Sequence, residues 1–429
     1  MKKNVLVFSG GSYPAIQIYY CLKDSLRFNP IAASSYEDHS QFVFRDSICT
    51  LPFIQEPNFI HSLNLLIDEK NISFIIPTHD TIALYLMEHK NKINAIIVCS
   101  PFETALLCRY KSKTYKQLQK YHFIPKLYDL HTATNDFPVF IKPDIGQGSQ
   151  DCSIVYNRTE LKQKLVNKES QIICEYLPGD EITIDCFTNR HKKLIFANAR
   201  SRERILNGIS ARSRNIPLSE ELRNIVDSIN QEICFRGYWF VQLKRDRKGE
   251  FKLLEISTRF AGTFGLSKSL DVNLPLLALC DFSDMDVSIT PNKYEIVSDK
   301  TYIDRYKINF SYQRVYIDFD DTIVHNRKLF NTMIMAFLYQ CLNKEIELIL
   351  ITKHAFDIRE TMKRIHLSSE IFSQIIVVPE NTYKYQYMDT KIESIFIDNA
   401  YEERQKVKQY LNMNTFDSCN VDCLLDWSQ

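Results

Sequence analysis

The chain has 429 residues, of which 45% are hydrophobic and 24% charged, and its 53 Lys and Arg residues almost balance 52 Asp and Glu residues. This composition is typical of folded soluble domains and excludes wholesale disorder. The net charge of +1 provides no general attraction to nucleic acid or to anionic lipid. The length predicts two or three domains rather than one core.

The sequence favours a cytoplasmic protein. No apolar run reaches the roughly 20 residues of a membrane-spanning helix, and the first one, NVLVF, is too short for a secretory signal, so we interpret it as a β-strand. The 12 cysteines are scattered without a C-x-x-C pair. Most lie in apolar strings, where cysteine behaves as a small buried residue, so neither a zinc site nor a disulfide framework is expected.

Three patterns follow one another along the chain. Residues 1–125 alternate short apolar runs (NVLVFSG, NPIAASS, ISFIIPTHD, AIIVCS) with helix-periodic stretches, which predicts a parallel sheet covered by helices. Residues 126–310 contain longer β-rich runs such as FPVFIKP, SQIICEYL, EITIDCFT, YWFVQLKRD and FKLLEIS, which predict an antiparallel sheet. A new strand–helix series begins near Arg314 with VYIDFDD, ELILITK, QIIVVPE and SIFIDNA.

A glycine-bearing loop marks a candidate phosphate site. Glycine is scarce in this chain, so a cluster of glycines indicates a place where the backbone approaches something closely. In PVFIKPDIGQGSQ a buried strand carries Lys142 and continues into a loop with Gly146, Gly148 and Ser149. The backbone N–H groups of such a loop can cover a phosphate chain that the lysine neutralises; a surface hairpin is the alternative interpretation.

Polar side chains also recur on the next strands. In ICEYLPGDEITIDCF, Glu175 ends one strand, and Glu181, Thr183 and Asp185 share one face of the following strand. Buried carboxylates need a polar partner, unless this face of the sheet is solvated, an alternative that the sequence leaves open.

A predicted hairpin offers ligands for a metal ion. The segment VQLKRDRKGEFKLLEISTRF predicts two strands that carry Gln242 and Glu255. Opposed on the hairpin, these side chains would offer the hard oxygens that hold Mg²⁺ against substrate phosphates. Arg259 lies just beyond and suits a transferring γ-phosphoryl group.

In this order, these segments resemble the ATP-grasp superfamily, particularly the branch of carbamoyl-phosphate synthase and biotin carboxylase. RYKSKTYKQL resembles the family's DK-x-x-TY segment, and RSRERILNGIS its arginine-bearing substrate loop. The resemblance covers about residues 1–310 and implies ATP as substrate with Mg²⁺, or Mn²⁺, as cofactor. It implies phosphate contacts from Lys111, Lys142, Gly146, Gly148 and Ser149, an adenine hinge at Glu175, Tyr176 and Leu177, a ribose contact from Glu181, metal ligation by Gln242, Glu255 and Ser257, and catalytic roles for Arg202 and Arg259.

Two positions depart from the pattern of this family. Ser257 stands where the family usually has Asn, so the second metal would be bound less directly. Tyr110 replaces the acidic residue before Lys111. Neither departure removes a group that ATP binding requires.

The last third of the chain carries a second set of acidic residues. VYIDFDDTIV is an apolar strand that ends in Asp318, Asp320 and Asp321. Neighbouring carboxylates repel one another unless a cation lies among them, and a carboxylate nucleophile beside a carboxylic acid suits aspartyl-phosphate chemistry. Thr352 and Asp398 end later strands, and in an open parallel sheet such strand ends meet in one crevice. A helix cap is the alternative for an acidic strand end alone.

This second pattern resembles the haloacid dehalogenase (HAD) superfamily. The resemblance implies Asp318 as nucleophile, Asp320 as general acid and base, and Thr352 and Lys384 as ligands of the phosphoryl oxygens. It also implies Mg²⁺ binding by Asp318, Asp320 and Asp398, assisted by Glu402, with Lys391 as an alternative to Lys384. The segment between Asp321 and Thr352 has room for a helix but not for a large cap domain.

The expected fold class is α/β and α+β multidomain: a pre-ATP-grasp parallel-sheet domain at 1–112, an ATP-grasp core at 113–310 and a HAD-like Rossmannoid domain without a large cap at 311–429. His79 and His354 follow strand ends, and we expect them to pack or form hydrogen bonds rather than belong to a site.

The two resemblances together predict a bifunctional enzyme. Its ligase part would join a small-molecule carboxylate to an amine through an acyl phosphate, releasing ADP and phosphate. Its aspartyl phosphatase part would dephosphorylate the product or a phosphorylated substrate, in surface-polysaccharide or small-metabolite tailoring. No nucleic acid and no membrane span are expected, and a homo-oligomer is left open. The alternative, which only Ser257 favours, is an active phosphatase with an ATP-grasp module that senses ATP without turning it over.

Overall fold

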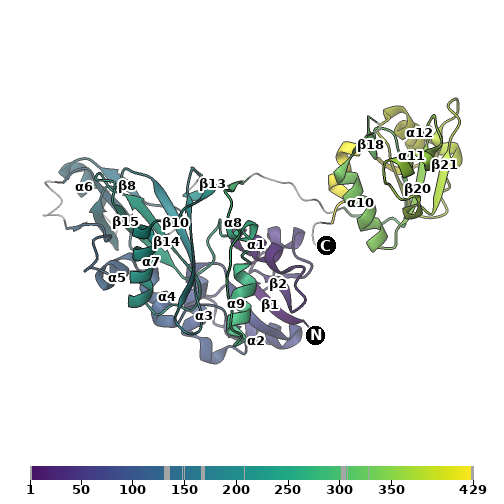
Figure 1. Cartoon of the computed structure of the whole chain (residues 1–429). Helices are drawn as coiled ribbons and strands as arrows, with labels where there is room; N and C mark the ends of the chain where they lie inside the picture. The colour runs from purple at the N-terminus through teal and green to yellow at the C-terminus, as the bar shows by residue number, and fades with distance from the viewer. Residues whose placement is uncertain are drawn as a thin grey trace. The chain divides into compact units, whose positions relative to one another are not determined.

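The structure is a computed structural model (Figure 1), and it describes residues 2–129, 136–146, 148, 150–165, 170–206, 208–300, 306, 308–326 and 328–426. The chain divides into two compact units, residues 1–302 and 303–429, and each is described by itself. The expected domains 1–112 and 113–310 fall almost entirely within the first unit, and the expected domain limits stay predictions.

Unit 1 begins with a five-stranded parallel sheet of order β3-β2-β1-β4-β5. Its strands are β1 (Lys3–Phe8), β2 (Phe28–Ala33), β3 (Ser47–Ile48), β4 (Ile72–Pro77) and β5 (Ile96–Ile97). Its helices are α1 (Tyr13–Leu22), α2 (Phe59–Lys70), α3 (Asp80–Glu88) and α4 (Phe102–Arg109). The apolar runs predicted as strands form this sheet because helices bury both of its faces.

The carboxyl ends of β1 and β4 lie side by side, since Phe8 pairs with Pro77. The loop before α1 therefore meets the loop before α3, and the Ser12 hydroxyl donates to Thr78 Oγ1 at 2.8 Å. Ser12 also caps α1 by accepting a hydrogen bond from Ala15 N. The polar residues that follow these two strands are thus held together at one edge of the sheet.

Two antiparallel sheets follow, as the β-rich runs predict. A four-stranded sheet has the order β6-β9-β7-β8, and the larger sheet has the order β12-β13-β11-β10-β14-β15, with β16 paired to β13. The strands are β6 (Leu127–Tyr128), β7 (Val139–Pro143), β8 (Ser153–Val155), β9 (Gln171–Glu175), β10 (Glu181–Thr188), β11 (Leu194–Ser201), β12 (Arg204–Leu206), β13 (Ile209–Ile216), β14 (Gly237–Arg245), β15 (Phe251–Ser257) and β16 (Val297–Asp299). The helices are α5 (Lys111–Gln117), α6 (Arg158–Leu165), α7 (Glu220–Glu232), α8 (Gly265–Ser269) and α9 (Leu274–Phe282).

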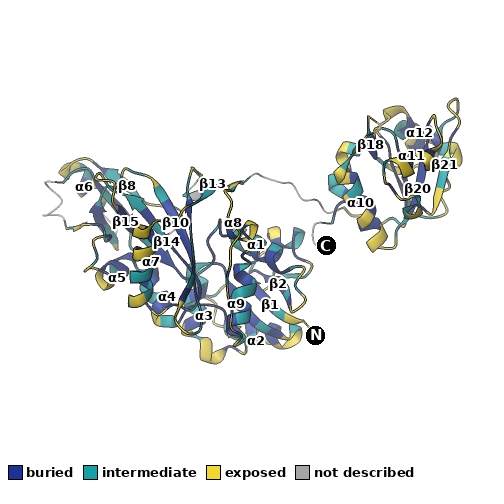
Figure 2. Ribbon diagram, viewed as in Figure 1, coloured by how far each residue is buried: buried dark blue, intermediate teal, exposed yellow. Residues whose placement is uncertain are grey.

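The alternation along β10 assigns its two faces. Ile182, Ile184 and Cys186 pack in the same apolar cluster as Val226 and Ile229 of α7, so this face of the sheet is covered by the helix. Thr183 and Asp185 lie on the opposite face, because successive side chains of a strand alternate. A second cluster unites the parallel sheet, the larger sheet and α9 in one core, which explains why residues 1–302 form a single unit (Figure 2).

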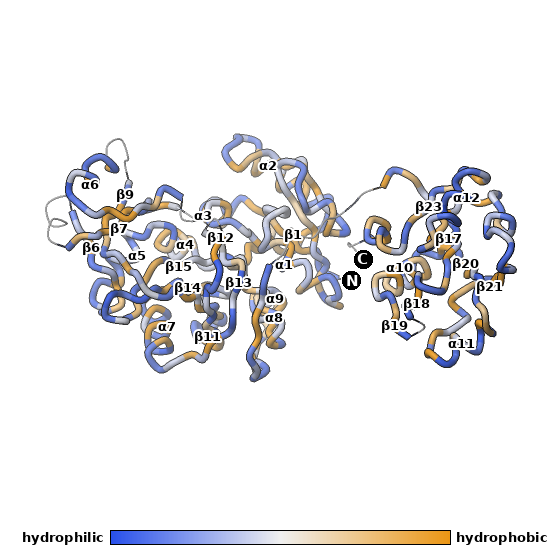
Figure 3. Tube along the Cα trace, turned by 90° about the horizontal axis from the view of Figure 1, so that it is seen from above, coloured by the Kyte–Doolittle hydropathy of each residue, from blue (hydrophilic) through white to orange (hydrophobic). Residues whose placement is uncertain are grey.

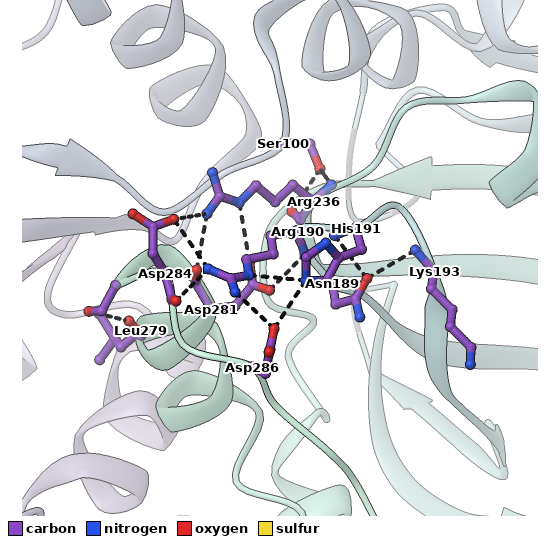
Figure 4. A network of polar contacts seen from close by, with 11 residues as sticks. Ser100, Asn189, Arg190, His191, Lys193, Arg236, Leu279, Asp281, Asp284 and Asp286 are labelled. Atoms are coloured by element: carbon purple, nitrogen blue, oxygen red, sulfur yellow. Dashed lines mark hydrogen bonds and ion pairs between the residues drawn. The ribbon is translucent and has the colours of Figure 1, made fainter.

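A polar network ties the larger sheet to α9 and to the segment after β5 (Figure 4). Buried Asp281 accepts hydrogen bonds from Arg190 N at 2.7 Å and from Arg236 Nε at 3.2 Å. Arg236 N in turn donates to Ser100 Oγ at 3.2 Å. The outer carboxylate of the network, Asp286, is largely exposed. We interpret this network as a structural joint, since its inner members satisfy one another.

Unit 2 is a five-stranded parallel sheet of order β21-β20-β17-β22-β23 with helices packed on it. Its strands are β17 (Arg314–Ile317), β18 (Val324–His325), β19 (Leu329–Phe330), β20 (Glu347–Thr352), β21 (Gln374–Val377), β22 (Ser394–Ile397) and β23 (Asn414–Phe416), and its helices are α10 (Thr332–Asn343), α11 (Ile358–Arg364) and α12 (Tyr401–Leu411). Between β17 and β20 the described residues form only the β18–β19 hairpin and α10. Hydrophobic and hydrophilic stretches alternate along this unit (Figure 3).

Candidate functional site

A cavity of about 640 Å³ lies in unit 1. Its walls come from the two antiparallel sheets and from the segments that follow β1, β4, β7 and β15. The expected nucleotide residues that line it are Lys111, Lys142, Gly146, Gly148, Glu175, Tyr176, Leu177, Glu181, Arg202, Gln242, Glu255 and Arg259. Ser149 lies outside the described residues, and Ser257 does not line the cavity.

Two lysines form the cationic wall of this cavity. The Lys142 ammonium, carried by β7, is buried and donates to Tyr115 Oη at 2.6 Å and to the carbonyl of Leu254 at 3.2 Å. Lys111, at the start of α5, points at the carbonyls of Asp144 and Gly146. Burial lowers the pKa of Lys111, which the carboxylate of Glu255 opposes and the charge of Lys142 reinforces.

A close contact between two glycines covers part of the cavity. Gly208 has a φ of +73°, and a Cβ there would lie 2.2 Å from the carbonyl carbon of Gly148. Only glycine combines this backbone conformation with so close an approach. The loop after β7 and the loop between β12 and β13 can therefore come this close only because residue 208 is a glycine.

Gln242 and Glu255 are direct cross-strand partners on β14 and β15, and Thr183 of β10 lies opposite Gln242. Within the described residues, no three His, Cys, Asp or Glu side chains are grouped as a complete metal site. Mg²⁺ does not need such a group, because it is usually bound by one or two protein oxygens together with substrate phosphates. An amide oxygen and a carboxylate on the cavity wall therefore fit this ion.

Arg202, between β11 and β12, contacts residues of β10 and β14 that line the cavity. It pairs with Glu181, donates to Gln242 Oε1 at 3.1 Å and donates to the carbonyl of Gly208 at 2.7 Å. Its Nε and the Thr183 hydroxyl are both buried without a hydrogen-bond partner among the described residues. Buried polar atoms without partners are rare, so both groups are available to a ligand in this cavity.

Unlike Glu181, Asp185 does not line the cavity. It is fully buried, accepts from Arg200 Nε at 2.7 Å and from the Tyr238 hydroxyl at 2.5 Å. The open question about this face of β10 is thus resolved: it is buried, and its carboxylates have basic partners.

Asp80 is a residue that the sequence patterns did not single out. It follows β4, and its carboxylate accepts from Ser257 Oγ at 2.6 Å and from Arg259 Nε at 2.8 Å. Burial alone would raise the pKa of Asp80, but the charge of Arg259 and the two hydrogen bonds lower it to about 2. The hydroxyl of Ser257 is therefore directed at Asp80. Arg259 is held in place by the same carboxylate, which follows a strand of the parallel sheet. In the sequence, Asp80 could have been noticed as the last residue of THD, a polar motif directly after a predicted strand.

Unit 2 brings a second set of predicted residues together. Lys384 Nζ donates to Asp318 Oδ1 and to Asp398 Oδ2, each at 2.6 Å. Burial and the charge of Asp398, opposed by Lys384, raise the pKa of Asp318 to about 6. Thr352, at the end of β20, is buried, and its hydroxyl has no hydrogen-bond partner in the described part of the chain. The ends of β17 and β22 thus meet at one ammonium, that of Lys384.

Where the structure describes the chain, Lys391 and Glu402 form no hydrogen bond or ion pair with Asp318, Lys384 or Asp398, whereas His354 contacts the predicted site residue Asp320. Lys391 is exposed, and Glu402 accepts from the Tyr383 hydroxyl at 2.7 Å. His354 Nδ1 lies 2.7 Å from Asp320 Oδ2, and its Nε2 lies 3.0 Å from Thr361 Oγ1. His354 is thus a hydrogen-bonding histidine, as expected, but its partner is a predicted site residue.

The charges at these strand ends suit a hard cation. Asp318 and Asp398 share the ammonium of Lys384, whereas Asp320 lies against His354. The carboxylates are thus in excess, and oxygen ligands are the type that Mg²⁺ prefers. The donor set fits the ion that the resemblance implies, although the ammonium of Lys384 already bridges two of the three carboxylates.

Comparisons with known proteins assign the fold of the first part of the chain. Residues 167–303 match a family described as "ATP-grasp in the biosynthetic pathway with Ter operon". No curated protein matches the chain. The fold is similar to that of biotin carboxylase from Campylobacter jejuni, solved as a β,γ-ATP complex, with a TM-score of 0.58 and 12% identity over 69% of this chain and 75% of that one.

Two further structures show the same fold. N5-carboxyaminoimidazole synthetase from Staphylococcus aureus with ADP matches with a TM-score of 0.56 and 15% identity, over 68% of this chain and 80% of that one. L-amino acid ligase from Bacillus licheniformis matches with a TM-score of 0.51 and 16% identity, over 66% and 74%. Residues 167–303 thus match an ATP-grasp family, and the first part of the chain has the fold of these structures, as predicted, whereas the HAD-like domain stays a prediction. None of the helices in the described ranges is long and apolar enough to cross a bilayer.

Proposed function

We propose that unit 1 is an ATP-dependent carboxylate–amine ligase. The observation that carries this proposal is that Lys111, Lys142, Gln242 and Glu255, from four separate elements, line one cavity in an ATP-grasp fold. The biotin carboxylase and the carboxyaminoimidazole synthetase of similar fold were solved with an ATP complex and with ADP, which supports ATP as the substrate here.

In this proposal, each wall of the cavity has one task. The segment from Glu175 to Leu177 contacts adenine, Glu181 contacts the ribose, and the two lysines neutralise phosphate oxygens. Gln242 and Glu255 would hold Mg²⁺, which would supply charge that neutralises the phosphate oxygens.

The reaction forms an amide in two steps. A carboxylate oxygen of the substrate attacks the γ-phosphorus of ATP, and the bond from this phosphorus to the β–γ bridging oxygen breaks, releasing ADP. Arg259 is placed to stabilise the charge on the transferring phosphoryl group. The amine nitrogen then attacks the acyl carbon, phosphate leaves with the C–O electron pair, and the nitrogen loses a proton. Arg202 holds the acyl phosphate, and contact between the Gly148 and Gly208 loops excludes water that would hydrolyse it.

We further propose that unit 2 is an aspartyl phosphatase. Asp318 attacks the phosphorus of a phosphate ester, and the leaving alcohol takes a proton from Asp320. Water then attacks the aspartyl phosphate while Asp320 accepts its proton, which releases phosphate and restores Asp318. The bridge of Lys384 between Asp318 and Asp398 supports this role, because it gathers two strand ends around one cation. Asp318, Asp320 and Asp398 would hold Mg²⁺, and Thr352 and Lys384 contact the phosphoryl oxygens.

The two activities would act in one route. A ligase that accepts a phosphorylated amine or acid makes a phosphorylated product, and the attached phosphatase removes the phosphate in surface-polysaccharide or small-metabolite tailoring.

The test measures ADP release from the full chain with a panel of acids and amines, including phosphorylated ones. Asp318→Asn should leave ADP release intact while a phosphorylated product accumulates, and Lys391→Met serves as the matched control. ATP binding without turnover for every pair would instead favour a sensor, and loss of both activities in Asp318→Asn would contradict the division between units.

A further inference from the structure

Lys300 is fixed at the end of the cavity by three separate parts of unit 1. It follows β16, and its backbone N donates to the carbonyl of Ala211 in β13 at 2.9 Å. Its side chain donates to the carbonyl of Gly262, after β15, at 2.9 Å. The ammonium also lies 4.0 Å from the centre of the Tyr13 ring in the first turn of α1. The position of this charge is therefore determined by the fold.

The ammonium faces a second hollow that continues the cavity. This hollow of about 430 Å³ is lined by Lys300 and by Gln17, Tyr20 and Ser298. Tyr13, Gly262 and Thr263 line both the hollow and the main cavity, so the two spaces adjoin. The nucleotide residues line only the main cavity, and the hollow is therefore at the end away from the expected ATP.

The charge of Lys300 has no carboxylate partner in the part of the chain that the structure describes. Arg200 is paired with Asp185 and Arg202 with Glu181, whereas Lys300 forms no ion pair with any carboxylate among the described residues. Burial, together with the charges of Arg200 and Arg202, lowers the pKa of Lys300 to about 8. A half-buried ammonium beside two guanidinium groups costs stability in the absence of an anion.

We propose that Lys300 binds an anionic group of the ligase substrate, a phosphate ester or a second carboxylate that is separate from the reacting carboxylate. The inference rests on the proposed ligase function and narrows its substrate class. Lys300 is thus a residue that determines specificity. A substrate with an anionic group seated in the hollow would place its reacting end toward Arg202 and Thr183, whose buried Nε and hydroxyl have no partner in the described residues. It would also give a reason for a phosphatase in the same chain if the group is a phosphate.

The test is isothermal titration calorimetry of the full chain in the Asp318→Asn background, saturated with a non-hydrolysable ATP analogue and Mg²⁺. This background prevents unit 2 from consuming a phosphate ester. The probes are O-phosphoethanolamine, β-alanine and ethanolamine, which carry a phosphate, a carboxylate and no anion. The variants are Lys300→Met, Lys300→Arg and, as control, Lys293→Met at an exposed position in the segment before β16.

We expect at least one anionic probe to bind about tenfold more weakly to Lys300→Met, to retain binding in Lys300→Arg, and to be unaffected by Lys293→Met. Which anionic probe depends on Lys300 identifies the group. The inference is overturned if Lys300→Met changes binding of both anionic probes less than threefold, or if neither binds the unsubstituted protein more tightly than ethanolamine. Failure of the ligase proposal is a different result, because no acid–amine pair would then release ADP while Lys300-dependent binding would still be measured.

Discussion

The carboxylate of Asp80 holds the guanidinium of Arg259 by a hydrogen bond of 2.8 Å from Nε, although 179 residues separate the two in the chain. Ser257 donates to the other oxygen of the same carboxylate. This contact joins the end of β4 in the parallel sheet to the end of β15 in the larger sheet. Arg259 is therefore oriented by a residue that does not line the cavity.

Asp80→Asn should lower the turnover of the ligase more than its affinity for ATP. The amide keeps the size of the carboxylate but loses the charge that orients Arg259, so stabilisation of the transferring phosphoryl group should suffer most. We expect kcat for ADP release to fall roughly tenfold, equivalent to about 1.4 kcal/mol, with KM for ATP changed less than threefold. Exposed Asp24 provides the control as Asp24→Asn. If Asp80→Asn instead lowers the Tm, and lowers kcat and the affinity for ATP by the same factor, the role of Asp80 is purely structural.

Gly208→Ala should weaken ATP binding by separating the two loops above the cavity. The new Cβ would meet the backbone of Gly148, and the displaced loop would lose its phosphate contacts. We expect the Kd for ATP to rise roughly tenfold, or about 1.4 kcal/mol.

Gly249→Ala is the matched control for this change. Gly249 also has a positive φ, +84°, but a Cβ there meets no atom within 4 Å. It therefore carries the same backbone cost, about 1 kcal/mol, without the contact. Equal Kd values for the two variants would show that the closeness of Gly148 and Gly208 does not matter for ATP.

Much of the fold could be predicted from the sequence, because its information is local. Runs such as EITIDCFT coincide with a strand, β10, since the two-residue period of apolar side chains matches the face that packs on α7. Parallel and antiparallel regions were also distinguishable from the spacing of their strands. The described residues of the predicted phosphate loop, hinge and hairpin line one cavity, and each of them lies on or next to a predicted strand.

The contacts across the chain could not be predicted in the same way. The roles of three residues depend on their contacts with other elements: Asp80, His354 and Lys300. The periodicity of a single sequence does not show which distant elements lie side by side. The segment that contains Lys300 is polar and has no motif. Its role depends on the pairing of β16 with β13, which a single sequence does not reveal.

His354→Ala should reduce phosphatase activity without unfolding unit 2. His354 contacts Asp320, the proposed general acid and base, at 2.7 Å, and a positioned proton donor contributes roughly 100-fold or more to such a step. We expect a loss of roughly tenfold in kcat for hydrolysis of p-nitrophenyl phosphate, since Asp320 stays but is less well oriented.

Two comparisons identify the role of His354. Thr361→Val removes the partner of its Nε2 and should cause a smaller loss in kcat, and His366→Gln, in the turn after α11, should cause none. ADP release by unit 1 should not change in any of the three. If His354→Ala hydrolyses the ester as fast as the unsubstituted chain, Asp320 does not need this contact.

Asp281→Ala should destabilise unit 1 without changing its affinity for ATP. The substitution leaves Arg236 and the backbone N–H of Arg190 without their buried acceptor (Figure 4). Removing one partner of a buried pair costs about 3 kcal/mol or more, which urea denaturation can measure. Asp286→Ala, in the exposed part of the same network, should have little effect on the free energy of unfolding. Equal effects of the two substitutions would mean that the network is not a structural joint.

Lys300→Met should stabilise the protein at pH 7 in the absence of substrate, and the gain should shrink as the pH rises. The pKa of Lys300 is about 8 in the folded chain, lowered from the model-peptide value of 10.5. Between these values the unfolded chain binds more protons than the folded one, so the stability of the unsubstituted protein rises with pH there. The cost of the buried ammonium is thus fully present below pH 8 and is relieved toward pH 10.5. Burial raises the pKa of Tyr13, whose ring lies against the ammonium, so this phenol should not mask the effect. Thermal unfolding of the two proteins between pH 7 and pH 10 measures the difference. A lower Tm for Lys300→Met at pH 7 would show that this lysine stabilises the fold, and that its charge is not kept for a ligand.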